Sequence, residues 1–222
     1  MTADRVVAHL SAVPIVGIVR ASSSPQAVDH GLRLASAGVH VVEVSLSVPA
    51  ALTAISQLAT RLDPSRHVVG AGTVLTARDA HEALDRGAAF LVSPILDLEV
   101  LAVARERDVL ALPGVATPTE AVAAARAGAV LQKQFPASNW SPASLKDLLQ
   151  PLPSLALVPT GGVDLRAAQE WIRVGARAVG LGTALLSLAD SELAIAVAAL
   201  RDLAAASRVR AAGMRSTHEP VS

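Results

Sequence analysis

The 222-residue chain has no cysteine and no tyrosine, and only two phenylalanines and two tryptophans. Without cysteine, neither a disulfide framework nor a cysteine-ligated metal site can form. The scarcity of aromatic rings argues against a surface that stacks on nucleic-acid bases. With 19 basic and 19 acidic residues, the formal net charge is zero. This balance argues against nucleic acid or an anionic membrane as the main partner.

Long apolar runs are also missing, because no stretch of about 18 uncharged apolar residues occurs, and we expect no membrane span. The first ten residues lack the basic and then apolar pattern of a secretory signal, so we expect a cytoplasmic protein. The chain is nevertheless 52% hydrophobic and only 17% charged. This composition suits one large domain, predicted over 1–206, and a flexible polar tail at 207–222. The low charge also suits a surface partly covered by self-association.

Lysine is scarce too, since only Lys133 and Lys146 occur among the 19 basic residues. Lys133 lies in a strand-like run that spans 129–136. Arginine keeps its proton and cannot act as a nucleophile, whereas an unprotonated lysine amine can attack a carbonyl group and form a Schiff base. Lys133 therefore fits either covalent chemistry on a carbonyl substrate or an ordinary surface lysine at a strand end.

One local pattern recurs: a helical segment ends in glycine, and an apolar run follows. It occurs at Gly38, Gly87, Gly128 and Gly175. A glycine just past a helix adopts the left-handed conformation that ends many helices, and the apolar runs fit strands buried on both faces of a parallel sheet. With the remaining apolar runs they predict strands near 13–19, 39–46, 67–71, 89–92, 109–112, 129–134, 155–159 and 177–181.

Helical patterns separate these runs, and several begin with capping residues such as Thr76, Thr117 and Ser141. They lie near 25–37, 50–62, 77–86, 98–107, 118–127, 142–149, 165–174 and 189–206. The alternation predicts an α/β fold, a (β/α)8 TIM barrel, with an extra N-terminal helix at 3–11 that plugs the barrel bottom. A doubly wound open sheet is the alternative, but no glycine fingerprint follows the first strand.

In TIM barrels the active site lies at the carboxyl ends of the strands, and these ends are unusually polar in this chain. Side-chain alternation places Glu43 and Lys133 on the inner face if Val42 faces the helices. The same alternation turns Gln132 and Gln134 toward the helices, where apolar residues are expected. A carboxylate inside an apolar barrel is costly unless paired, so Glu43 fits either a structural ion pair or a general acid/base beside Lys133.

Two glycine-rich turns follow the last two predicted strands, at Gly161-Gly162 and Gly182-Thr183. Barrels often build a phosphate site from backbone N–H groups at these two places. Two such turns on neighbouring strands favour phosphate binding over simple turn glycines. Arg20, at the end of the first strand, is a second candidate for binding an anion and can hold a carboxylate through two hydrogen bonds. The alternative is a surface arginine at a loop start.

The six histidines, at positions 9, 30, 40, 67, 81 and 218, show no spacing typical of metal ligands. We therefore expect no metal and no other cofactor. His30 and His81 fall within predicted helices and are expected at the surface. The sequence contains neither a nucleophile elbow nor a P-loop motif.

Six motifs follow one another between about Val13 and Leu186: VVEVSLSVP at 41–49, GAGTVL at 70–75, SP at 93–94, PG at 113–114, KQFP at 133–136 and TGGV at 160–163. As an ordered set they resemble the 2-keto-3-deoxy-6-phosphogluconate aldolases, the class I aldolases of Entner–Doudoroff metabolism. The resemblance implies a homotrimeric (β/α)8 barrel without a metal. It implies cleavage of a 2-keto-3-deoxy-6-phospho sugar acid to pyruvate and glyceraldehyde 3-phosphate. Activity on 4-hydroxy-2-oxoglutarate stays open.

The resemblance also implies roles for individual residues. Lys133 would form the Schiff base, and Glu43 would transfer protons. The substrate would be held by Arg20, Gly72, Thr73, Pro94, Phe135 and Thr160. Its phosphate would be bound by Gly161, Gly162, Gly182 and Thr183. The partners would be a small phosphorylated keto acid and further copies of the chain, with no nucleic acid and no membrane.

Two departures from the family's pattern bear on the substrate. Some members carry an arginine shortly after the glutamate, where this chain has Ser45-Leu46-Ser47, so we expect Arg20 to bind the carboxylate. The segment at 135–138 is similar to the galactonate branch and TGGV to the gluconate branch, which leaves the configuration at C-4 open. Two other functions fit the same residues: a phosphosugar isomerase or epimerase that uses Glu43, and a non-catalytic barrel that binds a phosphorylated metabolite.

Overall fold

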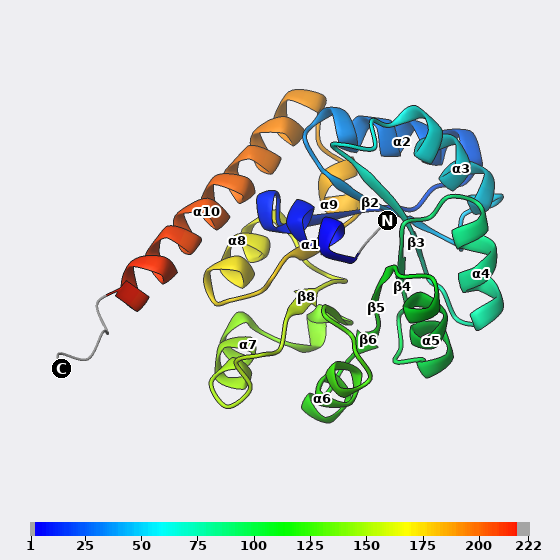
Figure 1. Ribbon diagram of the computed structural model, residues 1–222. Helices are drawn as coiled ribbons and strands as arrows, with labels where there is room; N and C mark the ends of the chain where they lie inside the picture. The colour runs from blue at the N-terminus through cyan, green and yellow to red at the C-terminus, as the bar shows by residue number, and fades with distance from the viewer. Residues whose placement is uncertain (1–2, 217–222) are drawn as a thin grey trace.

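The computed structural model describes residues 3–216, in which strands and helices alternate (Figure 1). The strands are β1 (Ile15–Val19), β2 (Val41–Ser45), β3 (Val68–Gly72), β4 (Phe90–Val92), β5 (Leu110–Leu112), β6 (Gly114–Val115), β7 (Gln132–Gln134), β8 (Leu157–Pro159) and β9 (Val179–Leu181). The helices are α1 (Ala3–Ala12), α2 (Ser24–Ser36), α3 (Ala51–Arg61), α4 (Ala77–Asp85), α5 (Leu98–Glu106), α6 (Pro118–Arg126), α7 (Pro142–Leu149), α8 (Leu165–Arg173), α9 (Thr183–Leu186) and α10 (Asp190–Ser216).

Every predicted strand has a counterpart in the structure, but the strand predicted at 109–112 does not lead directly into the next helix. It is followed by a second short strand, β6, because Pro113 has no N–H group to donate to a neighbouring strand and interrupts the pairing. Two short elements lie outside the predicted ones: α9 and a 3-10 turn at Ala137–Asn139.

Helix α10 does not end at 206, where the sequence pattern predicts its end, but continues to Ser216. The segment after Ser207 still contains alanine and arginine, which favour helix over coil. The expected polar tail therefore begins within a helix, and its last residues, 217–222, lie outside the described range. None of the helices within residues 3–216 is both long enough and apolar enough to cross a membrane.

All strand pairs are parallel and form two sheets. A six-stranded sheet has the order β5-β4-β3-β2-β1-β9, and a three-stranded sheet has the order β6-β7-β8. The sheets meet at Pro113, between β5 and β6, and at an isolated parallel bridge between Thr160 and Gly180 that links the end of β8 to β9. The result is a curled parallel sheet with helices on its outer side (Figure 1), so the carboxyl ends of the strands share one edge.

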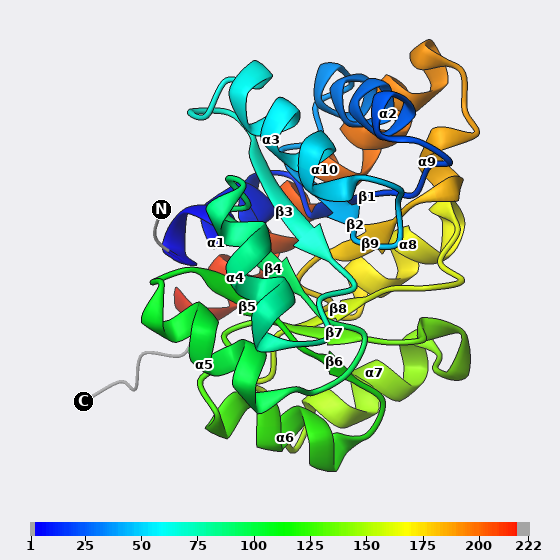
Figure 2. The same cartoon turned by 90° about the vertical axis from the view of Figure 1, so that its right-hand side faces the viewer.

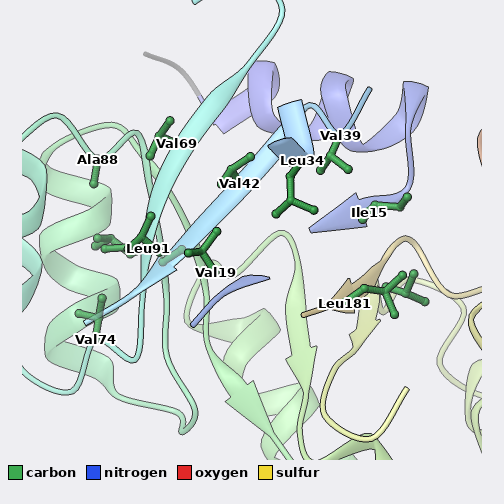
Figure 3. Packing of buried hydrophobic residues seen from close by; sticks show 14 of the residues in the cluster. Ile15, Val19, Leu34, Val39, Val42, Val69, Val74, Ala88, Leu91 and Leu181 are labelled. Atoms are coloured by element: carbon green, nitrogen blue, oxygen red, sulfur yellow. The ribbon is translucent and has the colours of Figure 1, made fainter. Parts of the chain in front are cut away.

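Apolar side chains cover both faces of the curled sheet. In the outer layer, strand residues such as Val42 pack against helical residues such as Leu34, and Leu91 on β4 belongs to the same cluster (Figure 3). The inner layer is a separate cluster formed by Val6, Leu10, Val16, Ile18, Val41, Val68, Phe90, Val92, Leu110, Leu112, Leu131, Val158 and Ala178. Alternate residues of β2 thus lie in different layers, as the period of two predicts.

Helix α1 closes the amino end of the inner layer. Its Val6 and Leu10 are buried in the inner cluster, and Figures 1 and 2 show α1 lying across one end of the strands. The ring of His9, on α1, meets the ring of His40 edge to face, with centroids 5.4 Å apart. Since His40 directly precedes β2, the closed end is the amino end, and the carboxyl end is left for the loops.

The two outward-facing glutamines of β7 have different surroundings, although each is only 1% exposed. Gln132 donates to the carbonyl of Ala129 (2.7 Å) and accepts from the backbone N–H of Ala156 (3.3 Å). Both polar atoms of the Gln134 amide are buried and have no hydrogen-bond partner. Burying an amide without a partner costs free energy, whereas a bonded amide supports the fold.

This difference predicts opposite effects for the same substitution at neighbouring positions. Gln134→Met removes an unbonded buried amide and should raise the free energy of unfolding by about 1–2 kcal/mol. The matched control Gln132→Met leaves two backbone groups unbonded and should lower it by about 1–3 kcal/mol. Urea unfolding of both variants checks this, and a Gln134→Met variant less stable than the parent chain would contradict the interpretation.

Candidate active site

Glu43 lies on β2 near the carboxyl end of the strands and is only 2% exposed. Its strand neighbours are Ile18 on β1 and Gly70 on β3, in register. Burial raises the pKa of the Glu43 carboxyl above its ordinary value, while the positive charges of Lys133 and Arg20 act in the opposite direction. A raised pKa makes the carboxylate a stronger base and lets the carboxyl group keep its proton to a higher pH, which suits a general acid/base.

The glycines of β3 make room for this carboxyl group. A Cβ on Gly72 would lie 1.9 Å from Oε1 of Glu43, and a Cβ on Gly70 would lie 2.4 Å from the ring of Phe90 in the inner cluster. Both glycines therefore face inward, and the Glu43 side chain rests on the bare backbone of Gly72. The sequence motif at 70–75 includes this glycine because only a residue without a side chain fits beneath the glutamate.

Lys133 lies on β7 and is 4% exposed. Its neighbours in register are Gly114 and Val158, and its backbone N–H donates to the carbonyl of Pro113 (2.9 Å). The Nζ atom lies 5.0 Å from the centre of the Phe135 ring. The lysine is thus an interior residue, which contradicts the alternative of a surface lysine.

A cavity of about 590 Å³ opens at the same end of the strands. Its wall includes seven of the predicted site residues: Arg20, Phe135, Thr160, Gly161, Gly162, Gly182 and Thr183. The two glycine turns therefore come together with the arginine, as the order of the strands predicts. Five predicted residues are not part of this wall. Glu43 and Lys133 lie within β2 and β7, Gly72 is the last residue of β3, and Thr73 and Pro94 follow β3 and β4.

The remaining predicted residues occupy tight turns beside the two ionisable groups. Thr73 has a left-handed backbone (φ 62°), and its hydroxyl lies 2.8 Å from that of Ser45, which in turn lies 2.8 Å from that of Ser47. Three hydroxyl groups therefore form a chain at the ends of β2 and β3. Pro94 is held against Gly114, where a Cβ would lie 2.2 Å from the Pro94 carbonyl.

His30 is a residue that sequence analysis places wrongly. It lies on α2 and lines the cavity instead of facing solvent, and its buried Nδ1 has no hydrogen-bond partner. Spacing relative to the buried positions Ala27 and Leu34 was the available signal, since positions three or four apart share a helix face.

Residues 6–198 match the family described as KDPG and KHG aldolase. The chain belongs to this family. A probable 2-dehydro-3-deoxy-6-phosphogalactonate aldolase from Rhizobium meliloti is 34% identical over 173 residues, which cover 78% of this chain and 81% of the relative. A 2-dehydro-3-deoxy-phosphogluconate aldolase from Pseudomonas aeruginosa is 38% identical over 142 residues, or 64% of each chain.

A solved structure of KDPG aldolase from Legionella pneumophila has a similar fold, with a TM-score of 0.69 and 26% identity. The likeness covers 90% of this chain and 96% of that one. In that structure pyruvate was captured as a covalent carbinolamine intermediate. Both the family and the fold of this chain are therefore those of the KDPG and KHG aldolases.

The packing of Glu43 on Gly72 generates a prediction for Gly72→Ala. The added methyl group must displace the carboxyl, because its Cβ would overlap Oε1, Cδ and Cγ of the buried Glu43. Since misplacing a catalytic group by about 1 Å can cost up to ~100-fold in rate, we expect aldolase activity to fall at least about tenfold. Steady-state kinetics, with circular dichroism to verify folding, test this. Unchanged kcat in a folded variant would show that the position of Glu43 does not matter.

Proposed function

We propose that the chain is a class I aldolase that cleaves a 2-keto-3-deoxy-6-phospho sugar acid to pyruvate and glyceraldehyde 3-phosphate. The observation that carries the proposal is the pair of buried ionisable groups, Glu43 and Lys133, near the carboxyl end of the strands and beside the cavity that Arg20 and the two glycine turns line. An amine and a carboxyl in that position supply a nucleophile and an acid/base. The covalent pyruvate adduct in the Legionella relative is chemistry of the same kind.

Schiff-base formation is the first part of the reaction. The neutral amine of Lys133 adds to the C-2 ketone to give a carbinolamine, and loss of water gives an iminium ion. The carboxyl group of Glu43 suits the proton transfers that this dehydration needs, because burial raises its pKa and thereby favours the protonated form that can donate. The positive iminium then withdraws electrons from the C-3–C-4 bond.

Cleavage follows when Glu43 removes the proton of the C-4 hydroxyl, directly or through a water. The C-3–C-4 bond breaks, its electron pair neutralises the iminium to give an enamine, and glyceraldehyde 3-phosphate leaves. Protonation at C-3 and hydrolysis of the imine release pyruvate and restore the amine of Lys133. No electrons are exchanged with another group, so the steps balance without a redox cofactor.

The cavity wall suggests how the substrate lies. Arg20 supplies the cation for the carboxylate, close enough to lower the pKa of Glu43 through its charge. The turns at Gly161-Gly162 and Gly182-Thr183 would bind the phosphate through backbone N–H groups. In our proposal Phe135, Thr160, Gly72, Thr73 and Pro94 shape the space between these two ends.

We further infer the complete (β/α)8 barrel. Taken as one strand, β5 and β6 join the two sheets on one side, and the Thr160–Gly180 bridge joins them on the other. We propose that residues 1–206 form this single domain with a C-terminal extension. Exposed Leu75, Ile95 and Leu98 and the low charge of the chain support a homotrimer. A cytoplasmic location completes the proposal.

The two lysines provide a matched test of this function. Lys133→Ala should reduce pyruvate release at least about 10³-fold, as expected when a nucleophile is removed, while Lys146→Ala, on the exposed side of α7, should match the parent chain. Coupled assays with substrates of gluconate and galactonate configuration also give the preference at C-4.

Three outcomes would contradict the proposal. Normal pyruvate release by Lys133→Ala would show that Lys133 does not form the Schiff base. Conversion of the phosphorylated sugar acid to an isomer without release of pyruvate would favour an isomerase or epimerase in which Glu43 alone transfers protons. Binding of the phosphorylated sugar acid without any product, by either configuration, would favour the non-catalytic barrel.

A further inference from the structure

The segment 182–188 forms one side of the cavity. Gly182, Thr183, Ala184, Leu186 and Ser187 all belong to the cavity wall. The segment consists of α9, which has only four residues, and the short connection to α10. A helix of one turn is not stable by itself, because nucleation costs more than its few hydrogen bonds return. Its position must therefore be held by contacts with the rest of the chain.

Arg33, in the last turn of α2, makes such contacts with one guanidinium group. Nη1 donates to the carbonyl of Leu186 (2.9 Å), and Nη2 donates to the carbonyl of Leu188. Nε pairs with Asp190 at the start of α10. The Arg33 side chain is 27% exposed, whereas that of Asp190 is 84% exposed. The two hydrogen bonds to the carbonyl groups are therefore better shielded from solvent than the ion pair. The exposed ion pair contributes little to holding the segment in place.

The chemistry of these contacts needs arginine. The planar guanidinium presents several N–H donors at fixed angles, so it can bond carbonyls at the end of α9 and beyond it at the same time. Lysine has a single mobile ammonium group that cannot reproduce this spacing. Arg33 is not part of the cavity wall, so any effect on a ligand is transmitted through the segment 182–188.

We propose that Arg33 is a positioning residue that fixes the segment 182–188 and thereby sets the affinity of the site for the phosphate end of its substrate. The proposal rests on the proposed function, since that function places the phosphate at Gly182 and Thr183. Removing the guanidinium leaves Lys133 and Glu43 untouched, because both lie on strands. Its loss should therefore weaken binding of the phosphorylated end and spare the chemical steps.

The experiment compares condensation of pyruvate with glyceraldehyde 3-phosphate and with unphosphorylated glyceraldehyde. Arg33→Met should raise the KM for the phosphorylated aldehyde roughly tenfold, with kcat nearly unchanged and no change in KM for glyceraldehyde. Arg33→Lys should give a smaller rise. Arg78→Met is the matched control, because it removes an exposed arginine that pairs with Glu82 on α4, and it should match the parent chain.

Three results would overturn the proposal. An unchanged KM for glyceraldehyde 3-phosphate in folded Arg33→Met would show that the segment 182–188 does not need the Arg33 hydrogen bonds to bind the phosphate. If that variant does not fold, an unchanged KM in Arg33→Lys would show the same. Equal rises for both aldehydes would indicate general loosening instead of a phosphate-specific role. If the parent chain itself shows no preference for the phosphorylated aldehyde, the phosphate site of the proposed function is overturned as well. The parent chain thus distinguishes failure of the phosphate site from failure of the Arg33 role alone.

Discussion

The burial of two opposite ionisable groups at one end of an otherwise apolar interior is the constraint on which the rest of this structure depends. Transferring the carboxyl group of Glu43 out of water costs free energy, and its raised pKa records that cost. The charges of Lys133 and Arg20 offset part of it. Gly72 leaves the space that the carboxyl occupies. The backbone, the packing and the nearby charges therefore all stabilise the Glu43 carboxyl in its buried position.

The interior differs between the amino and the carboxyl ends of the strands. At the amino end, α1 inserts Val6 and Leu10 into the inner cluster and excludes water. At the carboxyl end, the strands finish in polar residues and glycine turns, and a cavity remains. The apolar end supplies stability, and the polar end supplies chemistry. Loops and the short α9 form the cavity wall, so their positions depend on contacts from the surrounding helices. The hydrogen bonds of Arg33 to Leu186 and Leu188 are such contacts.

Repeating patterns in the sequence predict most of the fold. The helix–glycine–strand repeat gives the alternation of elements, and the period of two along β2 and β7 places Glu43 and Lys133 inside. Pairings between distant segments are not visible in such patterns. The Arg33 bonds to Leu186 and Leu188, the cavity position of His30 and the different surroundings of Gln132 and Gln134 all depend on how helices and strands pack. Local propensity ends the strand correctly before Pro113, but it could not predict β6, where pairing resumes, or the single turn of α9.

The proposed reaction depends on a covalent imine between Lys133 and the keto acid. The most direct measurement is incubation of the folded chain with pyruvate and sodium borohydride, followed by peptide mapping by mass spectrometry. We expect one reduced pyruvate adduct on Lys133, with Lys146 unmodified because it lies on the exposed surface of α7. No adduct on the folded protein, or equal labelling of both lysines, would show that Lys133 does not form the imine.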